Sequence, residues 1–493
     1  MSEFDKENSS TAINLNKKSN IPLYRQFYEK IRVAILNRQY SPGYRLPATR
    51  EAAREFGVSR NTVATAYDQL VAEGYLEARS GSGTYVSEKL PDDLLYAKTF
   101  SNRTLTKNNA GRELSKRGKL IARTPVNFPF NVKTLRPFAP CLPSAGDFPF
   151  QIWAKIISRR LRRPARNLLN YGEAAGYRPL REEIAAYLAT ARAVKCSAEQ
   201  VIIVSGAQQA IDLTARILLD RGDKVWTENP GYLGARGAFI AAETQIISVP
   251  VDEEGIRIEI GKQIAPDAKL ICVTPSHQYP LGVTMSLARR LELLKWANSA
   301  GAWILEDDYD SEFRYENRPF ASLQGLDNDN RVIYVGTFSK ILSPALRIGY
   351  LVAPPDLVNA FAAGKALLDR HSSLFEQMIL ADFFHEGHFA RHLRRMRNLY
   401  AERRDIFISA VESEANGKLE IAPSAAGLHL VGWLEDSAND LAIVRRASEN
   451  GVDCEPLSAL TVGKNKRPGL VLGYAAFDEK EIKRGVKKLA AIL

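Results

Sequence analysis

From about residue 137 onward, short apolar runs rich in β-branched residues alternate with longer helical segments, and this pattern limits the fold most strongly. Strands that alternate with helices indicate an α/β domain around a mostly parallel sheet. At 493 residues the chain also exceeds what one hydrophobic core usually supports. We therefore predict at least two domains, with the α/β domain over residues 137–493. The strands predicted most clearly are Val201–Val204, Lys224–Thr227, Leu270–Thr274, Trp303–Leu305 and Val332–Val335.

The first 136 residues divide into three segments of different composition. Residues 1–20 are polar and predict a disordered tail, whereas residues 21–90 alternate amphipathic stretches with glycine-bounded turns. Residues 91–136 hold 10 Lys and Arg against 3 Asp and Glu and show little periodicity, which predicts a basic linker. Positive charge concentrated in the first quarter of the chain would attract a polyanion, but a charge run is also typical of a solvated segment.

Nothing in the sequence indicates a membrane or secreted protein. No apolar run approaches the ~20 residues that a membrane-spanning helix requires. The four cysteines are widely separated and form no CxxC pair, which favours reduced thiols over a disulfide framework. We expect a cytoplasmic protein with no metal site.

Residues 21–90 carry the pattern of three helices followed by a hairpin. The second helix is predicted over residues 49–56 and ends at Gly57, and Ser59 is a suitable N-cap for the third helix. Two β-prone runs around a Gly/Ser turn then predict a hairpin, the wing. The predicted apolar stripes are Tyr24, Phe27, Ile31, Ala34 and Ile35 in the first helix, and Val63, Ala66, Tyr67 and Leu70 in the third.

A helix, a glycine turn and a second helix make up the helix-turn-helix arrangement. The N-terminal turn of its second helix would present Arg60, Asn61 and Thr62, where such helices usually meet base edges in DNA. The motifs PLYRQ, SPGYRLPATRE, GVSRNTV, AYDQLVAEGYL and GSGTYV resemble those of the GntR family of winged-helix regulators. The resemblance implies that Arg45, Arg50 and Arg60 contact double-stranded DNA and that Gly83 lies at the wing tip. Arg54 lies one helical turn after Arg50 and could share its phosphate-facing surface.

The segment TFSKILSPALRIGY (337–350) contains the residues that most strongly indicate a cofactor site. Lys340 follows an apolar strand, has hydroxyl groups beside it, and precedes Arg347 by seven positions. Pyridoxal phosphate needs such a set, because a lysine amine forms an imine with its aldehyde while hydroxyls and a guanidinium hold its phosphate.

Two other segments add groups that suit the same cofactor. The carboxylates of EDDYDSEF (306–313) follow a predicted strand that ends at Leu305. They could form a metal site, but no His or Cys accompanies them, and one of them could instead hold the proton of a pyridine nitrogen. The turn Ser205-Gly206-Ala207-Gln208 joins a strand to a helix and could bind a phosphate through backbone N–H groups. Tyr232 follows a further strand and could stack on an aromatic ring.

From residue 137 to the end, the motif order resembles the fold-type I aminotransferases. The matching motifs include NYGEAAGYRPLREEIAAYL, SGAQQAIDL, ENPGY, TPSHQYPLG and the two segments above. The resemblance implies an aminotransferase-like homodimer with the following roles: Lys340 as the Schiff-base lysine; Asp307 at the pyridine nitrogen; Tyr309 at the 3-hydroxyl; Thr337, Ser339, Arg347 and residues 205–208 at the phosphate; Tyr232 on the ring; and Tyr171 at the partner subunit's phosphate.

Two positions depart from the usual aminotransferase pattern. Tyr279 stands before Pro280, where an asparagine normally faces the cofactor's 3-hydroxyl. Val471 stands where an arginine commonly grips the substrate carboxylate, and Arg467, Lys466 or Arg236 are the candidates to replace it. An amino-acid ligand is therefore not secured by the sequence.

The whole chain after residue 20 resembles the MocR/GabR group, in which a winged helix is fused to an aminotransferase-like domain. The implied function is a pyridoxal-phosphate-dependent transcription regulator. It would sense an amine, an amino acid or the cofactor itself. An amine would replace Lys340 in the aldimine with the cofactor, that is, exchange an internal for an external aldimine, and transamination would be incidental. One alternative is a working aminotransferase that carries a DNA-binding module. The other is a repressor whose second domain serves only for dimerisation, which the intact Lys340, Asp307 and Arg347 argue against.

Overall fold

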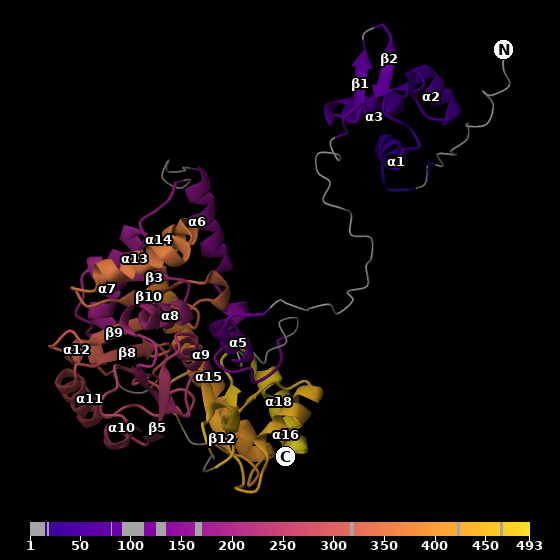
Figure 1. Ribbon diagram of the computed structural model, residues 1–493. Coiled ribbons are helices and arrows are strands. Elements are labelled where there is room, and N and C mark those ends of the chain that lie inside the picture. The colour runs from indigo at the N-terminus through magenta and orange to yellow at the C-terminus, as the bar shows by residue number, and fades with distance from the viewer. Residues whose placement is uncertain are drawn as a thin grey trace, which may run out of the picture. The chain divides into compact units, whose positions relative to one another are not determined.

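The computed structural model describes residues 15–16, 19–79, 81–90, 113–124, 135–162, 170–315, 320–421, 424–463 and 467–493. The chain divides into two compact units, residues 1–112 and 113–493, which are described separately (Figure 1). Most of the expected tail lies outside the described residues, as does most of the expected linker.

The first unit consists of three helices and a two-stranded hairpin. Its helices pack around Phe27, whose ring lies 5.3 Å from that of Phe56 and 6.3 Å from that of Tyr67. Tyr24, which was expected in this core, is exposed, and Tyr28 is buried instead and donates a hydrogen bond to Glu73. The elements are α1 (Leu23–Leu36), α2 (Thr49–Glu55), α3 (Arg60–Ala72), β1 (Leu76–Arg79) and β2 (Gly83–Val86).

The turns of this unit follow the chemistry that the sequence predicted. Gly57, which follows α2, has φ +62°, a left-handed conformation that glycine adopts without strain. Ser59 caps α3, because its hydroxyl accepts a hydrogen bond from the Thr62 N–H at 3.1 Å. The strands β1 and β2 pair antiparallel, and Arg45 forms a further bridge to Tyr85. The predicted helix-turn-helix with a wing is therefore confirmed.

The second unit is built on an eight-stranded sheet of order β3-β10-β9-β8-β7-β4-β5-β6. Strands β5, β4, β7, β8 and β9 run parallel, and β10 is antiparallel to both β3 and β9. The strands are β3 (Val201–Val204), β4 (Lys224–Asn229), β5 (Gln245–Asp252), β6 (Gly255–Ile256), β7 (Leu270–Val273), β8 (Trp303–Asp308), β9 (Val332–Thr337) and β10 (Gly349–Val352).

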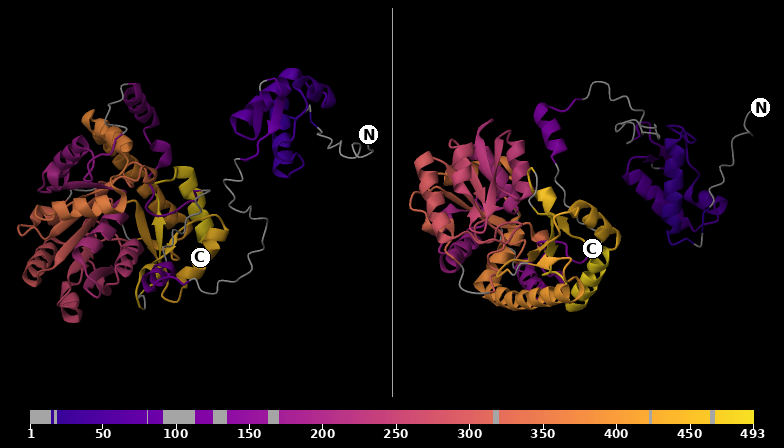
Figure 2. Two further views of the ribbon diagram at one scale, coloured as in Figure 1. Left: turned by 45° about the horizontal axis from the view of Figure 1, so that its top comes forward. Right: turned by 90° about the horizontal axis from the view of Figure 1, so that it is seen from below.

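Helices cover both faces of this sheet, because its strands are apolar on both sides (Figures 1 and 2). On β7, Leu270 and Cys272 face a core shared with α8, α9 and α13, whereas Ile271 and Val273 face a core shared with α10 and α11. The helices are α6 (Phe150–Arg162), α7 (Arg178–Arg192), α8 (Ala207–Leu218), α9 (Leu233–Ala241), α10 (Ile258–Ile264), α11 (Leu287–Ala300), α12 (Leu323–Leu326), α13 (Val358–Asp369) and α14 (Leu374–His385).

A smaller antiparallel sheet of order β11-β12-β14-β13 follows the long helix α15 (His388–Glu414). Leu430, Leu470 and Leu472 point into the largest core of the unit, while Val431 and Val471 face the opposite way. The remaining elements are β11 (Glu420–Ile421), β12 (His429–Trp433), α16 (Asp440–Glu449), β13 (Glu455–Pro456), α17 (Leu457–Leu460), β14 (Gly469–Gly473) and α18 (Glu479–Ile492).

In the second unit, the expected linker and the end of β8 differ from the sequence-based expectation. Within the segment expected to be a linker, Lys116–Arg123 form the helix α5, which packs on α9, and Arg117 forms an ion pair of 2.8 Å with Glu243, just after the end of α9. Strand β8 does not end at Leu305 but continues through Asp308, because its carboxylates are buried among partners. Among the described residues, we find no helix with the length and apolar character needed to cross a membrane.

Because each unit has its own core, we expect the two units to melt independently. Phe27→Ala should lower the stability of the first unit by about 3–5 kcal/mol, and Leu470→Ala should act only on the second unit. Differential scanning calorimetry of the full chain can separate the two transitions. If either substitution moved both transitions equally, the units would not be independent.

Candidate functional site

The parallel strands bring the predicted cofactor residues to one edge of the large sheet. Carboxyl ends of neighbouring parallel strands lie together, and ligands bind there in open α/β sheets. Asp307 lies at the end of β8, Lys340 follows β9, and Tyr232 follows β4. The segment 274–282 follows β7, between these elements in the sheet order.

The three consecutive carboxylates of β8 have separate roles. Glu306 accepts hydrogen bonds of 2.9 Å from the backbone N–H groups of Leu323 and Gln324 at the start of α12. Asp308 accepts a hydrogen bond of 2.8 Å from Arg192 Nε and another from the Tyr334 hydroxyl. Asp307 is also buried, but its Oδ1 has no hydrogen-bond partner among the described residues. Asp308 Oδ1 also lacks a partner among the described residues, but of the three carboxylates only Asp307 lines a cavity, together with Tyr232 and Thr274.

Burial raises the pKa of Asp307 to about 7, and the charge of Asp308 adds to this effect. The positive charge of Lys340 acts in the opposite direction. A buried carboxylate without a partner is costly unless a positive or proton-bearing group completes it. This position therefore suits the N–H of a pyridinium ring.

Tyr309 is held by a buried imidazole and a carboxylate. His277 Nδ1 lies 3.0 Å from the Tyr309 hydroxyl and 3.1 Å from Asp310 Oδ2. Burial and the charge of Asp310 raise the pKa of Tyr309 well above its usual range, so this phenol stays protonated. Ligand atoms of His277, Asp310 and His429 all lie within 4.8 Å of one another, a grouping that could hold a metal ion. The expectation of no metal site stays a prediction.

Lys340 is tied to the start of the second unit. Its Nζ donates a hydrogen bond of 3.0 Å to the backbone carbonyl of Cys141. The Cys141 thiol lies 3.5 Å from His429 Nδ1, and His429 Nε2 lies 3.0 Å from the carbonyl of Pro280. Burial lowers the pKa of His429 to about 3, so this histidine is neutral. Its Nε2–H therefore donates to Pro280, and its Nδ1 accepts from the Cys141 thiol.

The predicted phosphate-binding residues also lie together. Arg347 has a left-handed backbone (φ 51°), and its Nη2 donates to the Ser205 carbonyl at 2.6 Å. A Cβ on Gly206, the N-cap of α8, would lie 3.5 Å from the same nitrogen. The first turn of α8, with Ala207 and Gln208, therefore faces this guanidinium, and free N–H groups at a helix N-terminus attract anions. On the other side, the Thr337 hydroxyl accepts from the Ser339 N–H at 3.2 Å.

The two predicted aromatic contacts differ in exposure. Tyr232 is at the N-cap of α9, and its hydroxyl donates to Gln208 Oε1 at 3.2 Å, which places the ring beside the α8 turn. Tyr171 is 81% exposed, with the Arg370 guanidinium 5.3 Å from its ring centre. A tyrosine this exposed within one chain remains available to a partner subunit.

The small sheet adds residues that sequence reasoning missed. Glu455 on β13 pairs in register with Val471 on β14, and its Oε2 accepts a hydrogen bond of 2.5 Å from the Tyr279 hydroxyl. The Tyr279 ring lies 6.0 Å from that of Tyr309 and 6.2 Å from that of Tyr232. Neither Glu455 nor His429 belongs to a local motif, so only the tertiary fold reveals that they lie here.

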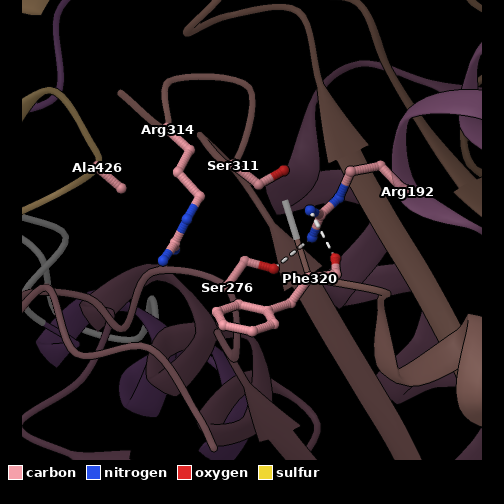
Figure 3. Close-up of a pocket in the computed structure, with 6 residues that line it drawn as sticks. All are labelled: Arg192, Ser276, Ser311, Arg314, Phe320 and Ala426. Carbon is pink, nitrogen blue, oxygen red and sulfur yellow. Dashed lines mark hydrogen bonds between the residues drawn. The ribbon is translucent and has the colours of Figure 1, made fainter. Parts of the chain in front are cut away.

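A small cavity is lined by Ser276 and Ser311, which are adjacent in sequence to His277 and Asp310 (Figure 3). Besides its bond to Asp308, Arg192 donates to the Ser276 hydroxyl and, at 3.1 Å, to the carbonyl of Phe320. Arg192 therefore links the end of β8 to the segment that carries His277. The cavity is lined by Arg192, Ser276, Ser311, Arg314, Phe320 and Ala426.

Of the candidate carboxylate-binding residues, Arg467 is paired elsewhere, whereas Arg236 has a buried Nε without a partner among the described residues. Arg467 donates to Glu420 at 2.6 Å and to the carbonyl of Leu434. Arg236 donates to the carbonyl of Leu460 at 3.3 Å and lines a small cavity with Glu228 and Asp307. Lys466 lies outside the described residues.

The predicted DNA-contacting residues lie on the surface of the first unit. Arg60 and Asn61, in the first turn of α3, are exposed, as are Arg50 on α2 and Gly83 at the start of β2. Thr62 is half-buried, and its hydroxyl lies 2.8 Å from that of Ser59, so it takes part in capping the helix. Arg45 is exposed beside the wing: a Cβ on Gly83 would lie 3.0 Å from its Nε.

Comparison with known proteins agrees with this arrangement. The model of the gntR family of bacterial regulatory proteins matches residues 23–86, and that of the class I and II aminotransferases matches residues 144–489. The chain is 42% identical to the probable rhizopine catabolism regulatory protein MocR of Rhizobium meliloti, over 96% of this chain and 94% of that protein. It is 31% identical to the pyridoxine biosynthesis transcriptional regulator PdxR of Corynebacterium glutamicum, over 96% of each chain.

Solved structures resemble the second unit. Kynurenine aminotransferase from Pyrococcus horikoshii, in complex with PMP, has a TM-score of 0.68 at 30% identity, over 81% of this chain and 98% of that one. LysN, the α-aminoadipate aminotransferase of Thermus thermophilus, carries a phosphopyridoxyl-leucine adduct and has a TM-score of 0.70 at 29% identity, over 76% of this chain and 96% of that one.

Fold and site together define a winged-helix transcription regulator with an aminotransferase-like second domain. The chain belongs to the class I and II aminotransferase family over most of its length and, with its gntR-family N-terminus, to the MocR-type regulators. The family and fold class expected from the sequence are confirmed. This fold implies pyridoxal phosphate as the cofactor, and the unpartnered Asp307 oxygen and the Arg347–Gly206 cradle fit that group.

We expect Asp307→Asn to stabilise the protein without cofactor while weakening cofactor binding. Because burial raises the pKa of Asp307 from 3.8 to about 7, the ionised carboxylate destabilises the fold progressively between those pH values. The variant should equal the wild type below pH ~4 and exceed it by at most about 4 kcal/mol above pH ~7. Its dissociation constant for pyridoxal phosphate should rise about tenfold or more.

Urea unfolding at several pH values and cofactor titration measure these two effects. Asp267→Asn, the same change at an exposed surface position, is the control and should leave cofactor affinity unchanged. Equal pH dependence in Asp307→Asn and the wild type would contradict the assignment.

For the DNA interface, Arg60→Ala should weaken binding to a selected operator by roughly 10- to 100-fold, as loss of one base contact does. Its affinity for random duplex should fall much less. Fluorescence anisotropy at fixed salt gives both constants, and Arg25→Ala on α1 removes an exposed charge as a control. Equal losses of affinity for the operator and for random duplex would indicate that Arg60 contacts only phosphate.

Proposed function

We propose that this protein binds an operator through its winged helix and adjusts that binding to a small amine or amino acid that would displace Lys340 from pyridoxal phosphate. The observation that carries the proposal is the convergence of Lys340, Asp307 and Arg347 at one sheet edge, in a chain that also has a DNA-binding unit. Pyridoxal phosphate supplies an aldehyde that condenses with amines and a ring that withdraws electrons.

The chain's own residues would divide the work of holding the cofactor. Arg347, Thr337, Ser339, Ser205 and the first turn of α8 would bind the phosphate, and Tyr232 would stack on the ring. Asp307 would hold a proton on the ring nitrogen.

Close to the reacting atoms, Tyr309 would donate its proton to the ring oxygen while His277 and Asp310 fix its orientation. Lys340 would supply the amine that an effector displaces. Its present hydrogen bond to the Cys141 carbonyl supports a link between this exchange and the segment that precedes α6, because that bond must change when Lys340 moves.

Several parts of the proposal rest on likeness to the family. We propose a homodimer in the cytoplasm, with Tyr171 completing the phosphate site of the partner subunit, because its ring is exposed in the single chain. Residues 21–90 would form the DNA-binding domain, 91–136 the connection, and 137–493 the effector domain. Sustained transamination is not needed for this function, since binding alone can shift a conformational equilibrium when affinities for the two states differ.

Lys340→Ala tests the proposal in the full-length protein. The variant should lose the visible absorption of the lysine-bound cofactor and any effector response, yet bind operator DNA within about twofold of the wild type, since the winged helix folds around its own core. Lys295→Ala, an exposed lysine on α11, should change neither property. Sustained conversion of a keto acid by the wild type would favour an aminotransferase instead. Loss of operator binding in a folded Lys340→Ala dimer would contradict the separation of roles.

A further inference from the structure

A cavity of about 550 Å³ lies at the start of α15, and none of the residues assigned to the cofactor lines it. We call it the α15 cavity. Its volume falls within the range of roughly 300–1,000 Å³ that is typical of small-molecule sites. Residues 146–152, the end of α14 and the first turns of α15 form its wall. These elements support one another, because α14 packs on both α6 and α15 (Figure 1).

Most of the wall of the α15 cavity is apolar and aromatic. Phe148 and Phe150 lie on one side, with ring centres 4.8 Å apart, and Phe383 of α14 completes the aromatic lining. Phe150 is exposed in spite of its size. Apolar walls with a small number of polar groups are characteristic of sites that bind small organic molecules, and aromatic walls favour a planar ring.

His392 is the only buried polar residue among those that line the α15 cavity. Its Nε2 lies 3.0 Å from the carbonyl oxygen of Ile341, so this nitrogen carries a hydrogen and donates it. Burial lowers the pKa of His392, so the ring is neutral and Nδ1 is an acceptor. Nδ1 has no partner among the described residues. A buried acceptor without a donor is costly, so a ligand that offers an O–H or N–H would be stabilised here.

Arg391 supplies a cation on the exposed side of the α15 cavity. Its Nη2 donates to the carbonyl of Glu386 at 3.0 Å and lies 2.8 Å from His388 Nδ1. No carboxylate pairs with Arg391 in the part of the chain that the structure describes, whereas Arg395 is paired with Asp147. The guanidinium of Arg391 can therefore receive a carboxylate.

Two hydrogen bonds connect the α15 cavity with Lys340. His392 holds the backbone carbonyl of Ile341, the residue directly after Lys340. The Lys340 Nζ donates to the carbonyl of Cys141, and the chain runs from there into residues 146–152 of the cavity wall. A ligand that moved His392 or this segment would therefore act on the backbone beside Lys340 and on the acceptor of its amine.

We propose that the α15 cavity is a second ligand site, for a small aromatic acid that carries a hydroxyl group and no amine. The hydroxyl donates to His392 Nδ1, the ring packs on Phe148 and Phe150, and the carboxylate pairs with Arg391. Without an amine this ligand cannot condense with the cofactor's aldehyde, so it modulates the site at Lys340 from outside. The binding site is independent of the proposed function, whereas its coupling to Lys340 rests on that function.

Three related probes test the site in the full-length protein loaded with pyridoxal phosphate. They are p-hydroxyphenylacetate, phenylacetate, which lacks the hydroxyl group, and tyrosol, which has an alcohol in place of the carboxylate. Isothermal titration calorimetry should show that p-hydroxyphenylacetate binds at least about tenfold more tightly than either of the others, because each of them leaves one polar group of the site unpaired. Equal affinities for all three probes, or no measurable binding, would overturn the site.

Two variants assign the two preferences to single side chains. Arg391→Gln should abolish the preference over tyrosol, and His392→Phe the preference over phenylacetate. Arg391 is exposed, so its variant should fold even if His392→Phe does not, as far-UV circular dichroism can check. Arg394→Gln, at an exposed position of α15 outside the lining, should change neither preference. An unchanged preference over tyrosol in Arg391→Gln would place the probe elsewhere and overturn the inference.

The coupling is measured by titrating p-hydroxyphenylacetate into the protein with and without pyridoxal phosphate. Formation of the imine changes the bond between Lys340 and Cys141, so the two dissociation constants should differ by about fivefold or more. Equal constants would overturn the coupling. If the wild type forms no absorbing complex with pyridoxal phosphate, the proposed function fails, and the affinities for the three probes still decide the site.

Discussion

Side-chain alternation along β8 is the constraint on which the site depends. Successive residues of a strand point to opposite faces, so three carboxylates in a row cannot share one environment. Glu306 accepts hydrogen bonds from the backbone of α12, and Asp308 accepts one from the guanidinium of Arg192, and these contacts oppose the cost of their burial. Asp307 is left on the ligand side with an unpaired oxygen. The fold thus tolerates the buried carboxylate of Asp307 at a position where a cationic ring could complete it.

The contacts around Asp307 place polar groups with different protonation behaviour close together. Burial keeps the Tyr309 phenol protonated and His429 neutral, while Asp307 has a pKa near the middle of the physiological range. Groups whose pKa values are shifted in different directions by one environment can hold protons at different atoms of a single ligand. The winged helix needs none of this chemistry, because its own core around Phe27 is formed by described residues between Leu15 and Leu90.

Residues in contiguous motifs could be predicted from sequence, because one strand and the loop after it determine their positions. Lys340, Asp307 and Arg347 lie at one sheet edge because β8, β9 and β10 are neighbours. Periodicity misjudged Tyr24, which has the right spacing but lies at the exposed edge of the α1 stripe. The end of β8 was placed too early because charged residues usually mark the surface. Glu455 and His429 could not be found, since strand pairing in the small sheet brings them to the site and no local signal marks them.

The helix α5 has a consequence for how far the two halves can act on each other. It lies just after the boundary between the units and packs on α9. The helix α9 is about 14 Å long and begins after Tyr232, the residue proposed to stack on the cofactor ring. Residues 116–123, which follow the first unit in the chain, therefore lie against a helix that starts at a proposed cofactor contact. A tilt of α9 would displace α5 directly, because the two helices pack against each other.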